Sequence, residues 1–292
     1  MTNIELTVVI PTFNRANKLK IALKNLKDQT LKNNLFEVIV VDDGSEDKTQ
    51  DIVKSFKNWK NLTYIKQKNL GQGVARNNAI AHAKGKTILF LGDDIYADKN
   101  LLKKHFEFHS RYSDDNFACL GLIEWYKKIK LTKFMKWLTN GGPQFAFKKL
   151  TPGAEATFWH FYTSNISLKK SLLDIEKFDE KFKSYGWEDI ELAYRLTKKF
   201  NLKIIFEPKA LAFHDHYMQP SSLKDRMFNV GKNSVYFEKE HPELKVSPRG
   251  LKKIIFLIIG SWPFLAISNI ISKKLYWYAL SKHYFLKGLR SA

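Results

Sequence analysis

The first 110 residues alternate short apolar runs with longer amphipathic stretches. Four runs have the length of strands: LTVVIP, FEVIVV, LTYIKQ and KTILFL. Three intervening stretches have apolar residues at helical spacing: ANKLKIALKNLKDQ, DKTQDIVKSFKNW and GVARNNAIAHAKG. We expect the third helix to end at Gly85. Strands that are apolar on both faces and alternate with helices form a parallel sheet covered by helices. With right-handed crossovers, the pattern predicts a Rossmann-like, doubly wound α/β half.

The pattern is less regular over residues 111–183, where aromatic side chains are frequent. We interpret this part as a second subdomain or as a set of substrate-binding loops. Clear helix and strand patterns return over residues 184–240. In a doubly wound sheet, ligands bind at the carboxyl ends of the strands. The function is therefore to be sought in the residues that follow each predicted strand.

The segment SYGWEDIELAYRLTKKF, residues 184–200, predicts an amphipathic helix with an acidic residue on its apolar side. A rotation of 100° per residue places Asp189 inside the apolar arc and Glu188 at its polar edge. Glu191 falls on the polar side. Asp189 is either an N-cap, since it lies near the start of the helix, or a functional carboxylate. The pattern alone leaves both explanations open.

Residues 254–272 form a run of 19 residues without a charge, with two lysines immediately before it and two immediately after it. This length just spans a bilayer core. However, Gly260 and Pro263 interrupt its middle, and a single span would put one basic flank outside. The following LYWYALSKHYFLKGLR interleaves aromatic and basic residues, as interfacial helices do. We favour a broken hairpin on the cytoplasmic leaflet over a true span or packing on the rest of the chain.

Composition and charge narrow the class of protein. The 292 residues are 44% hydrophobic and include one cysteine, Cys119, so a disulfide within the chain is impossible and a reducing compartment is expected. The start of the chain carries no signal-peptide pattern. The net charge is +20 and is densest in the last fifty residues. It suits nucleic acid, an anionic membrane surface or anionic substrates, although a generally Lys-rich composition also explains it.

Two pairs of aspartates follow predicted strands, Asp42 with Asp43 and Asp93 with Asp94. On one rim of a parallel sheet, these carboxylates repel each other unless a cation or hydrogen-bond donors offset the charge. Aspartate is also favoured in turns and helix caps, which explains the first pair equally well. For the second pair we favour metal or ligand binding.

Two histidines, His214 and His216, follow in FHDHY. Oxygen ligands with an imidazole suit Mn²⁺, and Mg²⁺ is the alternative, whereas no cysteines accompany them as in a structural zinc site. The helix that opens at GQG, with Arg76 in its second turn, could meet a phosphate. Neither a Walker A motif nor G-x-G-x-x-G is present.

Taken together, seven segments in this order resemble glycosyltransferase family 2, whose members are inverting, nucleotide-sugar-dependent enzymes with the GT-A fold. The segments are VVIPTFNR, VDDGSEDKT, NLGQGVARNNAI, ILFLGDD, SNISLKKSLL, FDEKFKSYGWEDIELAYRL and FHDHY. They cover roughly residues 5–217. The resemblance implies a Rossmann-like, mostly parallel sheet flanked by helices, with an apolar and basic helical appendage at the C-terminal end.

The resemblance also implies which residues bind the donor: Pro11, Thr12, Phe13, Asn14, Arg15, Asp42, Asp43, Arg76 and Asp93. The first five would form the loop under the nucleotide base, and the first aspartate pair would hydrogen-bond the base. Arg76 would lie near the ribose or diphosphate, and Asp93 near the ribose. Asp94 would bind a divalent metal, Mn²⁺ or Mg²⁺, together with His214 or His216. The usual acidic triplet begins here with Gly92, which is a departure from the family pattern.

For catalysis, the resemblance assigns Asp189 as the base that takes the proton of the acceptor hydroxyl in a single in-line displacement. Glu188 would position acceptor hydroxyls, and Trp187 would stack on a sugar face. The metal would offset charge on the departing nucleoside diphosphate.

The expected organisation has three segments. Residues 1–110 form the nucleotide-sugar-binding half, residues 111–240 the acceptor-binding and catalytic half of the same domain, and residues 241–292 a membrane-associated helical region. The expected partners are a nucleotide-sugar donor, a glycan or lipid-linked acceptor and an anionic membrane surface, without nucleic acid. We expect a bacterial enzyme of cell-wall or polysaccharide biosynthesis at the cytoplasmic face of the plasma membrane, peripheral or monotopic, or otherwise in the cytoplasm.

Three other classes remain as alternatives. A nucleotidyltransferase acting on a sugar phosphate would carry a Gly-rich basic signature after the first strand, where PTFNR stands instead. A nucleic-acid-binding protein agrees with the charge but not with acids crowded at the rim. A non-catalytic sugar-binding relative is disfavoured because Asp94, Asp189 and the histidines are all present.

Overall fold

The computed structural model describes residues 4–140, 142–183 and 185–292. Its contacts divide the chain into two compact units, which we call the sheet unit and the helical unit. The sheet unit consists of Met1–Lys130, Phe145–Lys181 and Asp189–His216. The helical unit consists of Leu131–Gln144, Phe182–Glu188 and Tyr217–Ala292. Residues 217–240 therefore group with the C-terminal helices, although the sequence placed them in the segment that ends at residue 240.

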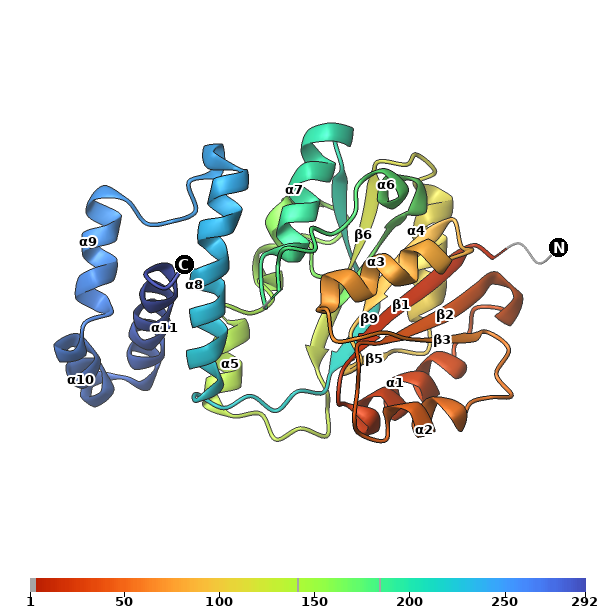
Figure 1. The fold of residues 1–292 in the computed structure, drawn as a ribbon, viewed down its shortest axis with the longest axis horizontal. Coiled ribbons are helices and arrows are strands. Elements are labelled where there is room, and N and C mark those ends of the chain that lie inside the picture. The colour runs from red at the N-terminus through yellow and green to blue at the C-terminus, as the bar shows by residue number, and fades with distance from the viewer. Residues whose placement is uncertain (1–3, 141, 184) are drawn as a thin grey trace. The chain divides into compact units, whose positions relative to one another are not determined.

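The sheet unit is built on one nine-stranded sheet with the order β3-β2-β1-β4-β8-β6-β9-β5, and β7 pairs with β9 (Figure 1). The strands are β1 (Leu6–Thr12), β2 (Phe36–Asp42), β3 (Leu62–Lys66), β4 (Thr87–Leu91), β5 (Ile95–Ala97), β6 (Phe117–Trp125), β7 (Glu155–Ala156), β8 (Asn165–Lys169) and β9 (Lys203–His214). β1 pairs in parallel with β2 and β4, and β2 with β3. The α/β fold expected from the alternating pattern is confirmed.

The sheet is more mixed than the predicted, mostly parallel one. β8 runs antiparallel to both β4 and β6, and β5 and β7 run antiparallel to β9. A strand buried on both faces has the same apolar pattern in either direction, so the pattern does not encode the direction of pairing. The connections between strands decide it. β5 was not predicted, because three residues are too few to show a period.

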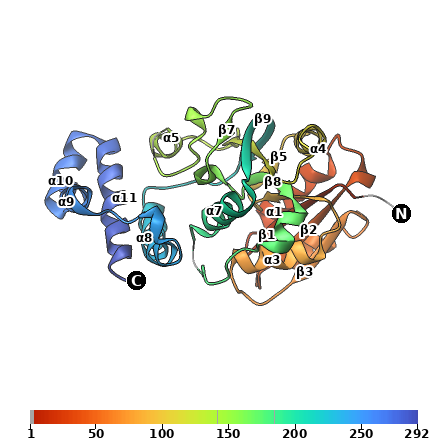
Figure 2. The same cartoon turned by 90° about the horizontal axis from the view of Figure 1, so that it is seen from above.

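Helices lie on both sides of the sheet (Figures 1 and 2). They are α1 (Ala16–Lys27), α2 (Thr49–Lys54), α3 (Gln72–His82), α4 (Leu101–Arg111), α6 (Lys170–Ile175) and α7 (Glu188–Phe200). Alternate strand residues face opposite sides, so Val8 and Ile10 join one core cluster with α1 and α4. Val9 joins the other cluster, with α3, α6 and α7. Single turns of 3₁₀ helix add η1 (Asn33–Leu35), η2 (Phe147–Lys149), η3 (Phe158–His160) and, in the helical unit, η4 (Pro242–Leu244).

Two predicted helix boundaries were wrong. α3 ends at His82, before Gly85. Gly85 instead permits a close backbone approach, since a Cβ there would lie 2.6 Å from the amide nitrogen of Thr7. α7 begins at Glu188 rather than at residue 184. Ser184, the first residue of the predicted helical segment, lies outside the described residues.

The helical unit contains α5 (Lys133–Thr139), α8 (Ser222–Glu240), α9 (Gly250–Ile259), α10 (Trp262–Ile271) and α11 (Lys273–Leu289). α8 and α11 approach each other at two glycines. A Cβ on Gly231 would lie 2.1 Å from the carbonyl oxygen of Phe285, and one on Gly288 would lie 2.0 Å from that of Phe228. Among the described residues no single helix is long and apolar enough to cross a bilayer. α9 and α10 meet that test only as a pair, and they are bent by 64°.

Candidate active site

Three predicted ligands meet beyond the ends of β4 and β9. Oδ2 of Asp94 lies 3.1 Å from Nδ1 of His216 and 3.5 Å from Nε2 of His214. One ligand atom from each residue lies within 4.8 Å of the others. The antiparallel pairing of β5 with β9 sets Ile95 opposite His214, and this register brings the two chain segments together. The sequence left open which histidine approaches Asp94, and in the structure both do.

The donor set fits a divalent cation. A carboxylate oxygen with two imidazole nitrogens suits Mn²⁺, which accepts both oxygen and nitrogen ligands. Asp94 and His214 are buried, and His216 is partly buried. Nδ1 of His214 is also buried and has no hydrogen-bond partner among the described residues. It is Nε2 of the same ring that faces Asp94, so the unpartnered Nδ1 indicates an ordered water or another group beside His214, not the metal itself.

Arg15 brings positive charge to the same carboxylates. Its Nη1 lies 2.7 Å from Oδ2 of Asp94 and 3.2 Å from Oδ1 of Asp93. Burial alone would raise the pKa of Asp94. Hydrogen bonds from His214 and His216, with the charge of Arg15, outweigh burial and hold this pKa well below its usual range. Asp94 is therefore the acid of the pair that stays ionised.

Asp93 is held differently from its neighbour. Its Oδ2 accepts a 2.8 Å hydrogen bond from Oγ1 of Thr12, the last residue of β1. Burial and the adjacent charge of Asp94 raise the pKa of Asp93 to about 6, against the lowering effects of Arg15 and Thr12. Two adjacent carboxyl groups with pKa values moved in opposite directions can hold different protonation states at one pH. The predicted ribose contact of Asp93 stays a prediction.

The predicted base-binding loop is shorter than expected. Pro11 and Thr12 belong to β1, so the connection to α1 begins at Phe13, which is exposed. Asn14 has a φ of 53°. Its Oδ1 accepts a 2.9 Å hydrogen bond from the amide of Glu46. The loop after β1 is therefore tied to the loop after β2, at the carboxyl edge of the sheet.

The first aspartate pair is hydrogen-bonded both within its own turn and to β3 and the segment that follows β3. Oδ1 of Asp42 accepts from the amide of Ser45 at 2.7 Å, and Oδ2 accepts from the hydroxyl of Tyr64 at 2.5 Å. Asp43 accepts from the side chain of Gln67 and from the amides of Leu70 and Gly71 at 2.8–2.9 Å. The second carboxylate thus fixes the start of α3. The bond to Ser45 supports the turn interpretation for Asp42, and the predicted contact of the pair with a base stays a prediction.

Arg76 is buried in the first half of α3. Its guanidinium lies over the ring of Phe178, with 5.2 Å from Cζ to the centroid, and donates to Oε1 of Gln72 at 3.1 Å. The ring contact is a cation–π interaction. The predicted approach of Arg76 to a ribose or diphosphate stays a prediction.

The first turn of α7 carries the predicted catalytic carboxylates. Leu192, Ala193 and Leu196 are buried, as the periodicity predicts. Glu188 is only 4% exposed, whereas Asp189 is partly buried. The placement of Glu188 at a polar edge was therefore wrong. Oδ1 of Asp189 accepts a 2.9 Å hydrogen bond from the next amide, that of Ile190.

Glu191 was also expected on the polar side but is only 3% exposed. Its carboxylate accepts a 2.7 Å hydrogen bond from Nε of Arg195, which also pairs with Glu176. An ion pair satisfies a carboxylate away from water, so the burial of Glu191 is compatible with its charge. Arg195 lies four residues further along the same helix, whereas Glu176 precedes the helix, and periodicity does not reveal that second partner.

Aromatic rings lie between Tyr162, which is influenced by the charge of Asp189, and the candidate metal ligand His214. Burial raises the pKa of Tyr162, and the nearby charge of Asp189 adds to the increase. The ring of Tyr162 lies 5.3 Å from that of Phe145, which in turn lies 5.7 Å from the ring of His214. The sequence noted Phe145 and Tyr162 only as members of an aromatic-rich region. Two ring contacts thus link Tyr162, whose pKa the charge of Asp189 raises, to a predicted ligand.

Trp187 belongs to the helical unit and packs there against α8. Its Nε1 donates a 2.8 Å hydrogen bond to the carbonyl oxygen of Val230, and its ring lies 4.7 Å from that of Phe237. Its φ of 80° is rare for a bulky residue. The predicted stacking of Trp187 on a sugar stays a prediction.

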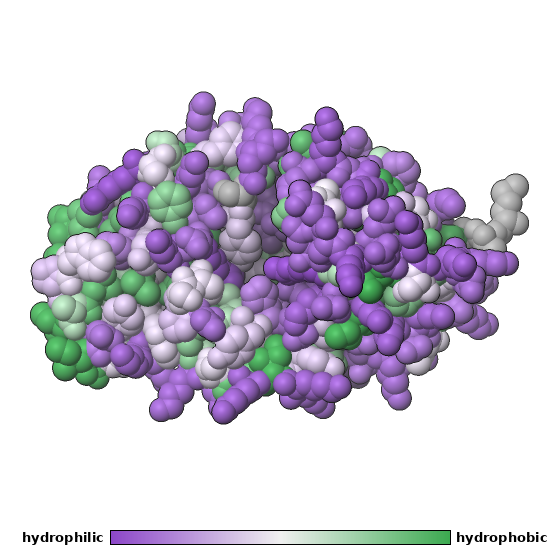
Figure 3. Space-filling model, turned by 60° about the horizontal axis from the view of Figure 1, so that its bottom comes forward, coloured by the Kyte–Doolittle hydropathy of each residue, from purple (hydrophilic) through white to green (hydrophobic). Residues whose placement is uncertain are grey.

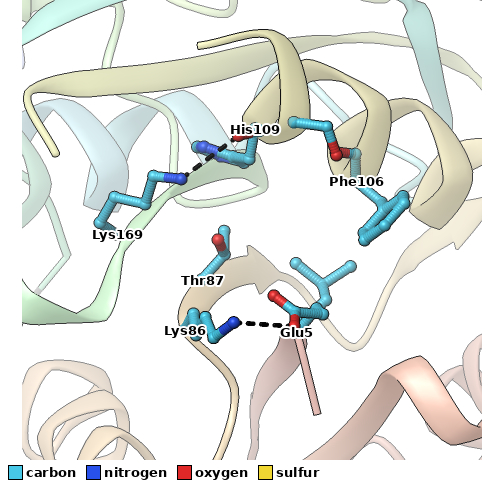
Figure 4. A pocket seen from close by; sticks show the side chains of 8 residues that line it. Glu5, Lys86, Thr87, Phe106, His109 and Lys169 are labelled. Atoms are coloured by element: carbon cyan, nitrogen blue, oxygen red, sulfur yellow. Dashed lines mark hydrogen bonds and ion pairs between the residues drawn. The ribbon is translucent and has the colours of Figure 1, made fainter. Parts of the chain in front are cut away.

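A small pocket lies at the opposite, amino edge of β1 and β4 (Figure 4). Its volume is about 60 Å³, and none of the predicted site residues lines it. Lys86 turns toward Glu5, at 2.9 Å, and Lys169 donates to the carbonyl oxygen of His109 at 3.4 Å (Figure 4). Both lysines thus make contacts within the protein, and we assign no ligand there.

Solved structures of low sequence identity share this fold. TarS residues 1–349 from S. aureus, in complex with UDP, is 21% identical with a TM-score of 0.59, and the match covers 99% of this chain and 91% of that one. The mannosyltransferase PcManGT from Pyrobaculum calidifontis, in complex with GDP-Man and Mn²⁺, is 18% identical with a TM-score of 0.68, covering 98% and 86%. These matches confirm the predicted fold class, the GT-A glycosyltransferase fold.

The family is shown by sequence. The model of glycosyl transferase family 2 matches residues 7–167, more than half of the chain, and the chain belongs to this family. The validoxylamine A glucosyltransferase of Streptomyces hygroscopicus subsp. jinggangensis is 30% identical over 224 residues, which is 65% of this chain and 51% of that protein. The chain spans about half the length of that relative. The family predicted from the seven segments is confirmed.

Proposed function

We propose that the protein is a metal-dependent, inverting glycosyltransferase. It transfers a sugar from a nucleoside-diphosphate sugar to a hydroxyl of a glycan or lipid-linked acceptor. The observation that carries this proposal is the meeting of Asp94, His214 and His216 at the carboxyl edge of the sheet. Membership of glycosyl transferase family 2 supports the reaction class.

Asp94, His214 and His216 would hold the metal, with Mn²⁺ favoured and Mg²⁺ the alternative. Bound there, a divalent cation would offset the charge of the departing nucleoside diphosphate. Of the two similar structures, TarS is in complex with UDP and PcManGT with GDP-Man and Mn²⁺, which supports a donor of this type. Arg15 adds fixed positive charge beside the same carboxylates.

Asp189 takes the proton of the acceptor hydroxyl in this proposal. Its side chain is partly exposed, so an acceptor can reach it, and a carboxylate is a suitable general base. Its charge acts on Tyr162, whose ring is two contacts from His214. Glu188 and Trp187, which precede it in the chain, are proposed to position the acceptor.

The reaction is tested with the full chain and a panel of UDP, GDP and dTDP sugars. We expect Mn²⁺-dependent release of nucleoside diphosphate from one donor, and thermal stabilisation by the matching nucleoside diphosphate only with Mn²⁺. Asp94→Asn should lose both responses. The exposed Asp174→Asn on α6 is the control and should keep both. Stabilisation of Asp94→Asn equal to the wild type would remove the metal site from the proposal.

The same assay separates the second enzyme class. A nucleotidyltransferase forms a nucleotide sugar from a sugar phosphate and a nucleoside triphosphate and releases pyrophosphate. We expect no pyrophosphate release from any nucleoside triphosphate with a sugar phosphate. Such release, without nucleoside diphosphate formation from sugar donors, would favour the alternative.

We also propose that the helical unit binds the anionic cytoplasmic face of the plasma membrane. Large apolar side chains are exposed on α9 and α10, which we call the α9–α10 surface: Leu251, Ile254, Ile255, Leu257, Ile258, Trp262, Ile267, Ile270 and Ile271. Figure 3 shows hydrophobic surface at its left end, where these helices lie. Exposed lysines lie at both ends of this surface, Lys252 and Lys253 next to Leu251 at its start, and Lys273 and Lys274 after Ile271. Apolar area with basic flanks suits an anionic lipid surface.

The bend between α9 and α10 is built into the helical unit. Gly260 lies at the bend, and its carbonyl oxygen accepts a 2.7 Å hydrogen bond from Nδ1 of His283 on α11. Ser261 caps α10 through its side chain, and Pro263 occupies the first turn. These features support a surface-lying, broken hairpin over a straight span.

Vesicle flotation tests the membrane proposal. We expect the full chain to float with phosphatidylglycerol vesicles more than with phosphatidylcholine vesicles, and Ile270→Asp to lower the bound fraction at least several-fold. Ile175→Asp, which changes an exposed isoleucine of α6, is the matched control and should bind as the wild type does. Absence of flotation, with self-association that Ile270→Asp abolishes, would instead assign the surface to a second copy of the chain.

A further inference from the structure

The two histidines of the metal-binding cluster are held by different means. His214 is the last residue of β9, and its carbonyl oxygen accepts a 3.0 Å hydrogen bond from the amide of Tyr126. The ring of Trp125 stacks on the ring of His214 at 5.3 Å and 14°. His216 lies beyond the strand, and its side chain is 38% exposed. Strand pairing therefore fixes His214 but does not reach His216.

Asp215, between the two histidines, supplies the missing constraint. Its amide donates a 2.8 Å hydrogen bond to the carbonyl oxygen of Asp94. Its Oδ2 accepts from Nζ of Lys18 at 2.5 Å and from the hydroxyl of Tyr96 at 2.6 Å. The side chain of Asp215 is 13% exposed, and Tyr96 is fully buried. The carboxylate is thus bound from α1 and from β5 at the same time.

Tyr96 is a rigid partner for this carboxylate. Its backbone lies in β5, where it pairs with Phe213 of β9, and its ring meets that of Tyr126 edge-on at 4.9 Å. A hydrogen bond from a hydroxyl to an ionised carboxylate is short and strong. The hydroxyl therefore anchors Asp215 to the same strand pair that positions His214.

We propose that Asp215 is a positioning residue for the metal ligands. Held by Lys18 and Tyr96, it fixes the backbone that carries His216 and keeps both imidazoles directed at Asp94. It does not itself contact the metal or the substrate. This inference rests on the proposed metal-dependent function and adds residues that neither the sequence motifs nor the family assignment singled out. Partners behind metal ligands typically change metal affinity by about 10–100-fold when they are removed.

If Asp215→Asn binds Mn²⁺ more weakly, the loss of a negative charge near the metal is a competing explanation. Two further variants separate it from positioning. Lys18→Gln removes a positive charge and leaves Asp215 intact, so electrostatics alone predicts tighter binding of a cation, whereas positioning predicts weaker binding. Tyr96→Phe changes no charge, so electrostatics alone predicts no change, whereas positioning again predicts weaker binding.

The experiment measures the dissociation constant for Mn²⁺ alone by electron paramagnetic resonance, without donor or acceptor, on the full-length protein. We expect increases of about 10-fold for Asp215→Asn and of several-fold for Lys18→Gln and Tyr96→Phe. Asp174→Asn is the control and should bind as the wild type does. Circular dichroism and thermal unfolding without metal identify any variant that fails to fold, and the two other variants then carry the test.

The possible outcomes distinguish this inference from the proposed function. If the wild type binds Mn²⁺ and all three variants bind it equally well, the positioning role is wrong and the metal site stands. If Asp215→Asn binds more weakly but Lys18→Gln binds more tightly, charge and not position explains the effect, and the inference is overturned. If the wild type binds neither Mn²⁺ nor Mg²⁺, the metal assignment and the inference fall together.

Discussion

Oδ2 of Asp94 lies 3.1 Å from Nδ1 of His216, although the two residues are 122 positions apart in the chain. The same oxygen also lies 3.5 Å from Nε2 of His214. One carboxylate oxygen therefore meets two imidazoles from a segment that follows a different strand. The arrangement depends on the pairing of β5 with β9, and it leads to the first of four predictions.

Removal of either histidine should weaken metal binding. We expect the dissociation constant for Mn²⁺ to rise in His214→Ala and His216→Ala by more than the 10–100-fold typical of outer partners, because a direct ligand is lost. Chelation of the wild type should abolish transfer, and added Mn²⁺ should restore it. The exposed His82→Ala on α3 is the control. An unchanged affinity in one of the two variants would show that the other histidine alone binds the metal.

Replacement of the proposed base should affect turnover and spare donor binding. Asp189→Asn keeps the size of the side chain and its 2.9 Å hydrogen bond to the amide of Ile190, so the start of α7 should form normally. We expect kcat to fall by roughly 10²–10⁴, as for loss of a general base, with unchanged affinity for the donor. Steady-state kinetics with Asp174→Asn as control check this. Turnover close to that of the wild type would rule out Asp189 as the base.

Stability should fall in acid because His105 of α4 is buried against strand β8. His105 hydrogen-bonds Ser167 and Asn165 of β8 at 2.7 and 2.9 Å, and burial lowers its pKa from 6.5 to about 4. Between these pH values the unfolded chain binds more protons than the folded one, so the free energy of unfolding falls as the pH falls. Complete protonation of His105 should lower the free energy of unfolding by about 3 kcal/mol.

Urea unfolding at a series of pH values from about 7.5 to about 4.5 measures how the free energy of unfolding depends on pH. This range runs from above the pKa of an ordinary histidine toward that of His105. In His105→Gln the protein should be less stable at neutral pH but should lose less stability on acidification. His82→Gln removes an exposed histidine and should keep the slope of the wild type. An identical slope in His105→Gln would assign the acid sensitivity to other groups.

The contact between α8 and α11 should not tolerate a methyl group. A Cβ on Gly231 would lie 2.1 Å from the carbonyl oxygen of Phe285, so the two helices must separate in Gly231→Ala. We expect a loss of about 1–3 kcal/mol in the free energy of unfolding, as for overpacked cores. Gly73→Ala is the control, since its Cβ would lie 3.6 Å from the nearest atom, Cβ of Phe178. It should be neutral or stabilising by up to about 1 kcal/mol. Equal effects of the two changes would contradict the close approach.

Local pattern was sufficient for much of the sheet unit. The apolar runs gave the positions of β1 to β4, and the amphipathic stretches gave α1 and α3, because burial on one or both faces leaves a period in the sequence. The motifs also singled out Asp94, His214 and His216. Pattern was misleading for α7, where Glu191 is buried in an ion pair with Arg195. Arg195 also pairs with Glu176, which precedes the helix, and no periodicity could show that second contact.

By itself, the sequence determined the α/β class, the family and the identity of the candidate ligands. Only the tertiary structure decided that β8 runs antiparallel to its neighbours, that both histidines meet one oxygen of Asp94, and that Lys18 and Tyr96 bind Asp215. The physical reason is the distance along the chain over which each interaction acts. Period and propensity report the environment of each residue, whereas strand direction, register and ion-pair partners depend on segments that are far apart in the chain.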